Sequence, residues 1–360
     1  MGSSKEFIPV PLPVTYDFSS NEILKTVIEA NKALAELKGV ALTIPNQNIL
    51  LNTLVLQEAK DSSEIENIVT THDELYRALA DAKNISKEAK EVKQYREAVY
   101  VGFESLKKQK ILTVNLILQI QSILLKNEAG IRKLPGTVLK NDKTGKVVLV
   151  PPQNYQTILR LLKNLEQYIN DDTMQDLDPT IKMGIIHYQF ESIHPFYDGN
   201  GRTGRIINIL YLILKELLDL PILYLSRYII RNKSNYYRLL QEVRTKNNWN
   251  DWTLFMLKGL RETAMDTIQI IHEMRKMMKE TKNIIREKER GIYSKDLLEI
   301  LFYHPYTKIK FLESHLKIHR QTASTYLKKL ERLGLLTGVK LGREMYYINN
   351  RLYNLFRSKT

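Results

Sequence analysis

Residues 187–205 read HYQFESIHPFYDGNGRTGR and hold most of the chemically informative side chains of the chain. Just before the glycines, residues 181–193 carry apolar side chains at three- and four-residue spacing, which predicts a helix. The glycines at 199, 201 and 204 fit the G-x-G-x-x-G pattern of dinucleotide-binding loops. That pattern needs a preceding strand and an acidic residue at the end of a second strand about 20 positions later, and the helical periodicity here provides neither strand. We therefore expect a turn at 198–201 that opens a second helix near Arg202.

This predicted turn is a candidate anion site, because backbone N–H groups at a helix N-terminus attract negative charge. Near it lie a titratable base, His194, and a carboxylate suited to a hard cation, Asp198. Two guanidinium groups, Arg202 and Arg205, are three residues apart and so share one helix face. Arginines match the charge of a polyphosphate, Mg²⁺ bridges phosphate oxygens, and a neutral histidine accepts a proton from a hydroxyl. Each residue alone also has a structural interpretation, but together they predict phosphoryl or nucleotidyl transfer.

The run HPFYDGNGRTGR at 194–205 resembles the complete signature of the Fic family. This resemblance implies that His194 activates a hydroxyl of a target protein and that Asp198 holds Mg²⁺. It also implies an ATP site made by the rest of the motif: Gly199, Asn200, Gly201, Arg202, Thr203, Gly204 and Arg205. The implied reaction is transfer of AMP from ATP to a Ser, Thr or Tyr hydroxyl. Fic relatives with lysine in place of Asp198 work differently, so the carboxylate favours adenylylation over phosphorylation.

A second resemblance lies upstream, in the hexapeptide SSEIEN at 62–67. It is similar to the inhibitory pattern of the same family, in which a Ser or Thr is followed three residues later by Glu and then by Gly or Asn. Ser62, Glu66 and Asn67 fill that pattern, and its position before the motif is that of class II members. The resemblance implies that Glu66 pairs with Arg205 in the place of the γ-phosphate. The alternative is an ordinary capping box of Asp61 and Glu64, with Glu66 a solvated helix residue.

Residues 136–150, GTVLKNDKTGKVVLV, predict a β-hairpin, because two β-branched runs flank a cluster of turn-forming residues at 141–145. The hairpin resembles the flap of Fic proteins, whose edge would pair with an extended segment of the target. A surface hairpin without a partner is an equal alternative.

Two aromatic or titratable residues near the motif have competing interpretations. Tyr237 resembles the aromatic residue that lines the adenine pocket in the family, although an aromatic residue on a helix is more often part of the core. His187 lies seven residues before His194 on the same helix face, and without an acidic neighbour we expect it to be structural rather than a metal ligand.

The amino-acid composition excludes several other classes of protein. The 360 residues are 43% apolar and 26% charged, as expected for a globular protein of two or three domains, and only 15 are Gly. The absence of Cys excludes cysteine-ligated zinc and thiol catalysis. The N-terminus lacks the unbroken apolar run of a signal peptide, and no stretch reaches the roughly 20 apolar residues of a membrane span. We therefore expect a cytoplasmic protein without membrane contact.

The chain divides into four expected regions: a helical region with the inhibitory motif at 1–95, a catalytic core at 96–265, a connecting helix at 266–290 and a basic module at 291–360. That module carries 13 Lys+Arg and 5 Asp+Glu, so it supplies +8 of the net +14. Helices at 294–303, 306–316 and 319–330, followed by a strand pair ending at 345–348, resemble a winged helix-turn-helix. Its partner is left open between DNA and protein.

The expected fold class is mainly α, with a helical Fic-type core, a β-hairpin flap and a C-terminal winged helix. The expected function is an ATP- and Mg²⁺-dependent protein adenylyltransferase restrained by Glu66. One alternative is a DNA-binding regulator whose core only senses nucleotide, although sensing needs no base such as His194. Another is the reverse reaction, in which Glu66 positions water to remove AMP. The resemblance leaves the target protein open and is compatible with self-modification and with a homodimer.

Overall fold

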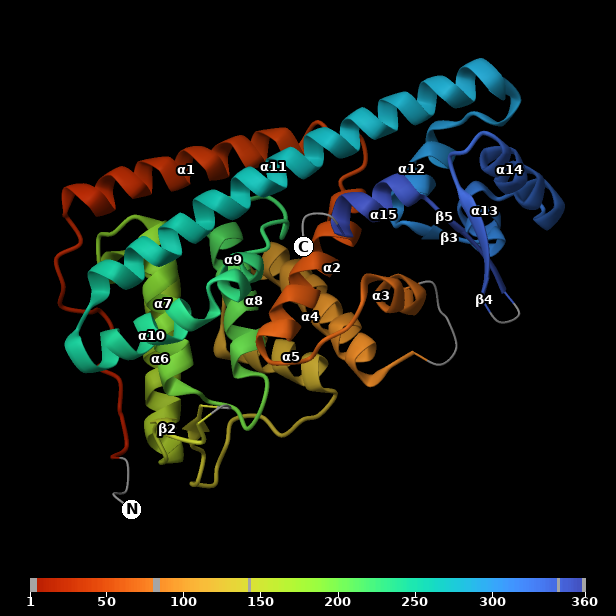
Figure 1. Ribbon diagram of the computed structural model, residues 1–360. Helices are drawn as coiled ribbons and strands as arrows, with labels where there is room; N and C mark the ends of the chain where they lie inside the picture. Colours follow the sequence, from red (N-terminus) through yellow and green to blue (C-terminus); the bar gives the residue numbers. More distant parts are fainter. Residues whose placement is uncertain (1–4, 80–84, 142–143, 342–343, 358–360) are drawn as a thin grey trace.

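The computed structural model describes residues 5–79, 85–141, 144–341 and 344–357. Most of these residues lie in helices, and the strands form one two-stranded and one three-stranded antiparallel sheet (Figure 1). The mainly helical class expected from the sequence is confirmed. No helix in the described part of the chain is long and apolar enough to cross a membrane.

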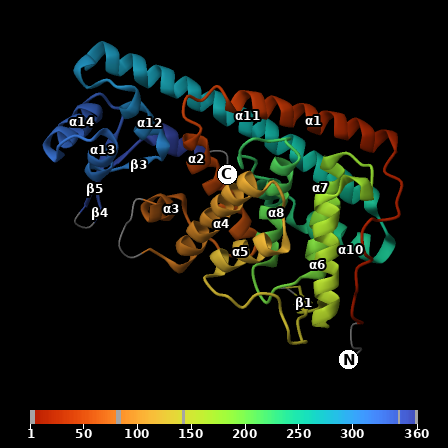
Figure 2. The same ribbon diagram turned by 180° about the vertical axis from the view of Figure 1, so that it is seen from behind.

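Two long helices, α1 (Asn21–Ala41) and α11 (Trp249–Lys288), run side by side along one edge of the molecule (Figures 1 and 2). The connecting helix expected at 266–290 is part of α11, which begins well before it because the apolar periodicity continues back to Trp249. Gly259 inside α11 does not break the helix. A Cβ at this position would lie 2.7 Å from the Tyr228 ring, so glycine permits close packing there.

The rest of the core is a helical bundle beneath this pair. Its helices are α2 (Asn48–Ile65), α3 (His72–Leu79), α4 (Lys87–Gln109), α5 (Val114–Leu125), α6 (Tyr155–Asn170), α7 (Pro179–Ile193), α8 (Asn200–Leu214), α9 (Ser226–Arg231) and α10 (Lys233–Lys246), with a 3₁₀ turn at Asp172–Met174. Every residue of α7 from Thr180 to Ile193 is buried, as in a central helix packed on all sides. Helix α8 packs directly on α7, so the core itself fixes the loop between them.

A hairpin forms where the sequence predicted one, but its strands are short: β1 (Leu139–Lys140) pairs antiparallel with β2 (Val147–Leu149). Residues 142–143 of the expected turn lie outside the described residues. An extended N-terminal arm lies against this region, since the Phe7 amide donates to the Val150 carbonyl at 2.8 Å.

The C-terminal region has the elements of a winged helix. After a 3₁₀ turn at Arg290–Ile292 come α12 (Lys295–Tyr303), β3 (Tyr306–Thr307), α13 (Ile309–Leu316), α14 (Arg320–Arg332), β4 (Thr337–Leu341), β5 (Glu344–Ile348) and α15 (Asn350–Arg357). The sheet order is β3-β5-β4. The helix expected from residue 306 starts instead at Ile309, because Tyr306 and Thr307 pair with Ile348 and Tyr347 of β5.

This region is docked onto the core rather than separate from it. The Tyr306 ring stacks on Tyr76 of α3 at 5.8 Å, and its hydroxyl donates to Asp73. Asn46 donates to Glu299 of α12 at 2.7 Å. Helix α14 and the β4–β5 hairpin lie at the end of the molecule away from α7 and α8 (Figure 1).

Candidate active site

The turn between α7 and α8 has the conformation that the glycine pattern requires. His194 follows the last residue of α7 with φ 48°, and its amide donates to the Phe190 carbonyl at 3.0 Å. Gly199 has φ 77°, a left-handed conformation that favours glycine, and α8 begins at the next residue. The backbone N–H groups of residues 199–201 therefore lie at a helix N-terminus, as expected.

Asn200 shapes this turn from within. Its amide nitrogen donates to the Phe196 carbonyl at 2.8 Å, and its amide oxygen accepts from the Phe196 N–H at 2.9 Å. Asn200 and Phe196 are both buried, so they hold the loop on the core. Arg132 fixes the other side, donating to the His194 carbonyl at 2.8 Å.

The structure holds His194 in its neutral form. Burial, followed by the charges of the nearby cations Arg132 and Arg244, lowers the pKa of this imidazole to about 3. A neutral imidazole at physiological pH can accept a proton from a hydroxyl, which is the first requirement of a general base.

Arg205 binds the upstream motif at 62–67 and holds it beside the turn. Its Nε donates to Ser62 Oγ at 2.8 Å, and Nη2 donates to the Ser62 carbonyl at 2.9 Å and to Glu66 Oε1 at 2.8 Å. A side chain at position 201 would collide with the Glu66 carboxylate, so this carboxylate lies directly against Gly201. An anionic group already occupies the turn at which an anion was expected.

Residues 62–67 end a helix rather than begin one. Helix α2 stops at Ile65, Glu66 is its C-cap, and Asn67 has φ 63°, which explains why the pattern ends in Asn or Gly. The capping-box interpretation of Asp61 and Glu64 is wrong, because both lie in the last turn of α2. Asp61 is buried there, and Glu64 pairs with Lys60 at 2.9 Å.

Arg202 is held by two carboxylates. Its Nη1 donates to Glu91 Oε2 at 3.0 Å, and Nη2 lies 3.5 Å from Asp198 Oδ1. Sequence reasoning missed Glu91, which belongs to no motif and resembles the other charged residues of α4. The only available signal was indirect: a buried arginine requires a counter-charge somewhere.

The remaining predicted residues fall into two groups. Thr203 is fully buried, and a Cβ at Gly204 would lie 2.9 Å from Glu191 Oε1, so both positions contribute to packing of α8. Tyr237 on α10 is 43% exposed, with its ring 5.1 Å from that of Tyr236. Tyr236 instead reaches the core, where its hydroxyl lies 2.8 Å from Nε2 of His187. His187 is fully buried in this polar contact, which supports its structural interpretation.

Asp198 is the candidate cation ligand. Its side chain is 72% exposed, and Oδ1 accepts from the Gly199 N–H at 2.6 Å. No group of three or more His, Cys, Asp or Glu side chains suited to a metal occurs among the described residues. One exposed carboxylate beside an anion site fits Mg²⁺, which is commonly held by a single carboxylate together with substrate phosphates and water.

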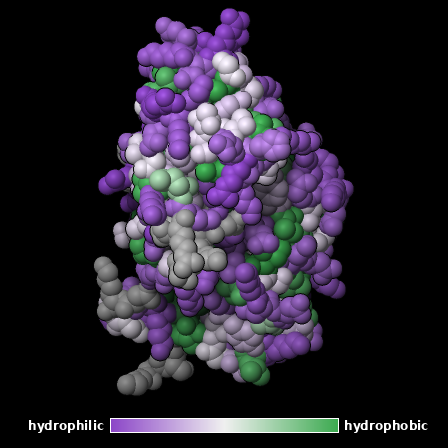
Figure 3. All heavy atoms as spheres, turned by 90° about the vertical axis from the view of Figure 1, so that its right-hand side faces the viewer, coloured by the Kyte–Doolittle hydropathy of each residue, from purple (hydrophilic) through white to green (hydrophobic). Residues whose placement is uncertain are grey.

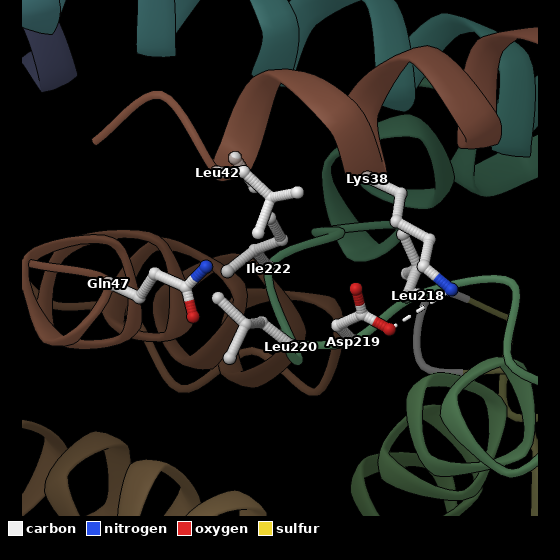
Figure 4. Close-up of a pocket in the computed structure, with 8 residues that line it drawn as sticks. Lys38, Leu42, Gln47, Leu218, Asp219, Leu220 and Ile222 are labelled. Carbon is white, nitrogen blue, oxygen red and sulfur yellow. Dashed lines mark ion pairs between the residues drawn. The ribbon is translucent and has the colours of Figure 1, made fainter. Parts of the chain in front are cut away.

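A pocket elsewhere in the core does not compete with this site. It lies between the end of α1 and residues 218–222, with the Lys38–Asp219 ion pair at 3.0 Å on its rim (Figure 4). Its volume of about 10 Å³ is close to that needed for one water molecule, so it is far too small for a nucleotide.

Models of known protein families match the region that contains this site. The model of the Fic/DOC family matches residues 111–212, which include the whole motif, and the Fic/DOC N-terminal model matches residues 24–104. Together these two models cover more than half of the chain. The chain belongs to the Fic/DOC family. The C-terminal domain of SoFic-like protein adenylyltransferases also matches, at residues 277–352.

Individual relatives agree with this assignment. The probable protein adenylyltransferase aq_aa38 of Aquifex aeolicus is 30% identical over 200 residues, which cover 53% of this chain and 56% of that protein. The protein adenylyltransferase fic-1 of Caenorhabditis elegans is 36% identical over 56 residues, 16% of this chain and 11% of that protein. The chain thus matches about half of the first relative and a small part of the second.

Solved structures show the same fold over a longer span. A Fic family protein from Desulfovibrio desulfuricans covers 94% of this chain, and 97% of its own length, with a TM-score of 0.60 at 18% identity. Fic-1 from C. elegans, residues 134–508, covers 71% of this chain and 74% of its own, with a TM-score of 0.54 at 19% identity. The Fic fold is therefore shared even where sequence identity is low.

Proposed function

We propose that this protein is an ATP-dependent protein adenylyltransferase that transfers AMP to Ser, Thr or Tyr hydroxyls of target proteins. The observation that carries the proposal is the arrangement at one helix start: the neutral base His194, the anion-accepting turn at 199–201, and the guanidinium groups of Arg202 and Arg205. The names of the relatives described above are consistent with it.

In this mechanism, His194 accepts the proton of the target hydroxyl while its oxygen attacks the α-phosphorus of ATP. The new P–O bond forms as the bond to the β-phosphate oxygen breaks, and pyrophosphate leaves with the electron pair. Backbone N–H groups at 199–201 and the two arginines stabilise the negative charge of the phosphates. Asp198 would hold Mg²⁺, which offsets phosphate charge when bound.

We further propose that Glu66 restrains this reaction. Its carboxylate lies against Gly201 and pairs with Arg205, so it competes with a nucleotide phosphate for the Arg205 guanidinium and for the space beside Gly201. Glu66 is also the more exposed partner, with 34% of its side chain exposed against 2% for Arg205. Arg205 keeps two contacts with Ser62 when Glu66 moves away, so release of the glutamate leaves the arginine in place.

Two further parts of the proposal concern the substrates. The short β1–β2 hairpin offers strand edges to which an extended target segment can pair. Tyr237, half exposed on α10, is proposed to contact the adenine. Self-modification through the same hairpin, and a homodimer that presents one copy to another, fit this arrangement.

Intact-mass measurement after incubation with ATP and Mg²⁺ tests the reaction, with the Glu66→Gly variant included to remove the proposed restraint. A gain of one adenylyl group supports the proposal. A gain of one phosphate overturns the reaction class. Loss of an adenylyl group from a previously modified sample, with none gained from ATP, would instead identify the reverse reaction.

A second candidate function is binding of duplex DNA by the winged helix. Five basic side chains near its free end have no carboxylate within ion-pair distance in the described part of the chain: Lys317, Arg320, Lys328, Arg332 and Lys340. Nearby carboxylates are engaged, since Glu331 accepts from the Gly338 N–H at 2.8 Å. Hydrophilic residues predominate on this side of the molecule, with apolar ones between them (Figure 3).

A further inference from the structure

The surroundings of Arg202 differ from those of Arg205, the other arginine of the motif. Its side chain is 2% exposed, and both of its terminal nitrogens face carboxylates, Glu91 at 3.0 Å and Asp198 at 3.5 Å. Its Nε has no hydrogen-bond partner among the described residues. Because a buried cation is costly without a counter-charge, these two carboxylates determine where the guanidinium points.

The two carboxylates are not equivalent. Asp198 lies on the turn with 72% of its side chain exposed, and it is the residue that would hold Mg²⁺. Glu91 is only 21% exposed and lies in the second turn of α4, a helix that packs on α8. When Asp198 turns towards a cation, Glu91 is the carboxylate that still balances and orients Arg202.

Arg205 provides the contrast. It is held by the hydroxyl and the carbonyl of Ser62, two neutral acceptors, in addition to Glu66. Arg202 makes no hydrogen bond to a neutral acceptor within the described ranges. Loss of Glu66 therefore leaves Arg205 oriented, whereas loss of Glu91 leaves Arg202 without its fixed partner.

We infer that Glu91 is a positioning residue that keeps Arg202 directed at the phosphates of a bound nucleoside triphosphate. This inference rests on the proposed function, because it takes the turn at 199–201 as the nucleotide site. It gives Glu91 and Glu66 opposite roles, although each is a glutamate paired with an arginine of the motif: Glu66 opposes the nucleotide and Glu91 supports its binding.

The test uses the full-length chain carrying Glu66→Gly, in which the nucleotide site is accessible. Glu91→Gln retains the shape of the side chain and removes only its charge. Glu97→Gln, at an exposed position of the same helix, is the matched control. We expect Glu91→Gln to raise both the Kd for ATP, measured by calorimetry, and the KM for ATP by about tenfold. The kcat should change little, because a contact made equally in the ground and transition states acts on KM.

A second comparison asks whether Glu91 acts through Arg202. In a chain that carries both Glu66→Gly and Arg202→Ala, Glu91→Gln should cause no additional loss of kcat/KM. A rise in transfer with Glu91→Gln, an unchanged Kd, an equal effect of Glu97→Gln, or the same loss without Arg202 would overturn the inference. Calorimetry with ATP needs no turnover, so a chain that binds ATP but transfers nothing would contradict the proposed function while still testing Glu91.

Discussion

Glu66 Oε1 lies 2.8 Å from Nη2 of Arg205, although 139 residues separate the two in sequence. The contact joins the end of α2 to the first turns of α8 and brings a carboxylate against Gly201. The anion site is therefore filled by the chain itself. A nucleotide that binds productively must displace this carboxylate or bind around it.

Removal of that carboxylate should activate transfer. Glu66→Gly is expected to raise auto-adenylylation, measured by intact mass or by labelled ATP, because the Arg205 guanidinium and the space beside Gly201 become available to phosphate. Arg205→Ala added to this variant should abolish the gain, so the two changes are non-additive. Glu64→Gly is the matched control, since Glu64 pairs with Lys60 and, among the described residues, makes no hydrogen bond or ion pair with Arg205. Equal activation by both glycine variants would mean that loosening of α2, rather than loss of the Glu66 charge, is responsible.

Binding and chemistry should separate at His194. In the Glu66→Gly chain, His194→Ala is expected to lower the transfer rate by about 10²–10⁴-fold, the usual cost of losing a general base. The Kd for ATP should stay within roughly threefold, since the imidazole acts on the target hydroxyl rather than on the phosphates. Calorimetry and single-turnover labelling measure the two quantities. A parallel loss of both would make His194 a structural residue of the α7 terminus.

The helices and the turn were predictable because their causes are local. Apolar residues at helical spacing define α7, and the glycine at 199 is required by a positive φ. The Glu66–Arg205 contact was predictable for a different reason, namely that residues 62–67 resemble a family pattern. Without that resemblance, periodicity alone places Glu66 on a helix end and says nothing about its partner.

The features that the sequence did not predict depend on distant partners. The two-residue strand at Tyr306–Thr307 exists only because β5 pairs with it. Glu91 is one of several charged residues on α4, and periodicity separates the core side of that helix from its surface side without selecting the residue that meets Arg202. The helix expected at 266–290 is only the second part of α11, because its apolar periodicity continues back to Trp249.

Acid should destabilise the fold through His187. This ring is fully buried between the Tyr236 hydroxyl at 2.8 Å and Asn208 Nδ2 at 3.1 Å, and burial, followed by the Arg205 charge, lowers its pKa to about 3. A histidine in the unfolded chain has a pKa of about 6.5. Between about pH 3 and pH 6.5, His187 is therefore protonated in the unfolded state and neutral in the folded state. The free energy of unfolding therefore falls as pH decreases through this window, by about 2 kcal/mol at about pH 5 for this one group.

The His187→Gln variant isolates that contribution. It should be less stable than the natural chain at about pH 7.5, because it loses packing against Trp252, and the difference should shrink by about 2 kcal/mol at about pH 5. Urea unfolding of both proteins at the two pH values measures the difference, and the other buried histidines cancel in the comparison. A difference that does not change with pH would show that His187 does not stay neutral in the folded state.

If the winged helix binds DNA, the affinity for a duplex should depend on which basic residues are replaced by glutamate. Arg320→Glu with Lys328→Glu reverses two charges on α14, and Lys25→Glu with Lys163→Glu makes the same change at exposed positions of α1 and α6. If α14 contacts the phosphates of a duplex, the first pair should weaken binding of a mixed-sequence duplex by the full chain much more than the second. In the first pair, the slope of log K against log [salt] should also become shallower by about 2, because roughly one counterion is released per phosphate contact. Fluorescence anisotropy between about 50 and 200 mM salt measures both effects, and unchanged ATP binding confirms that the variants fold. Equal losses for the two pairs would indicate general attraction to a basic protein, and no binding at the lower salt concentration would favour a protein as the partner of this face.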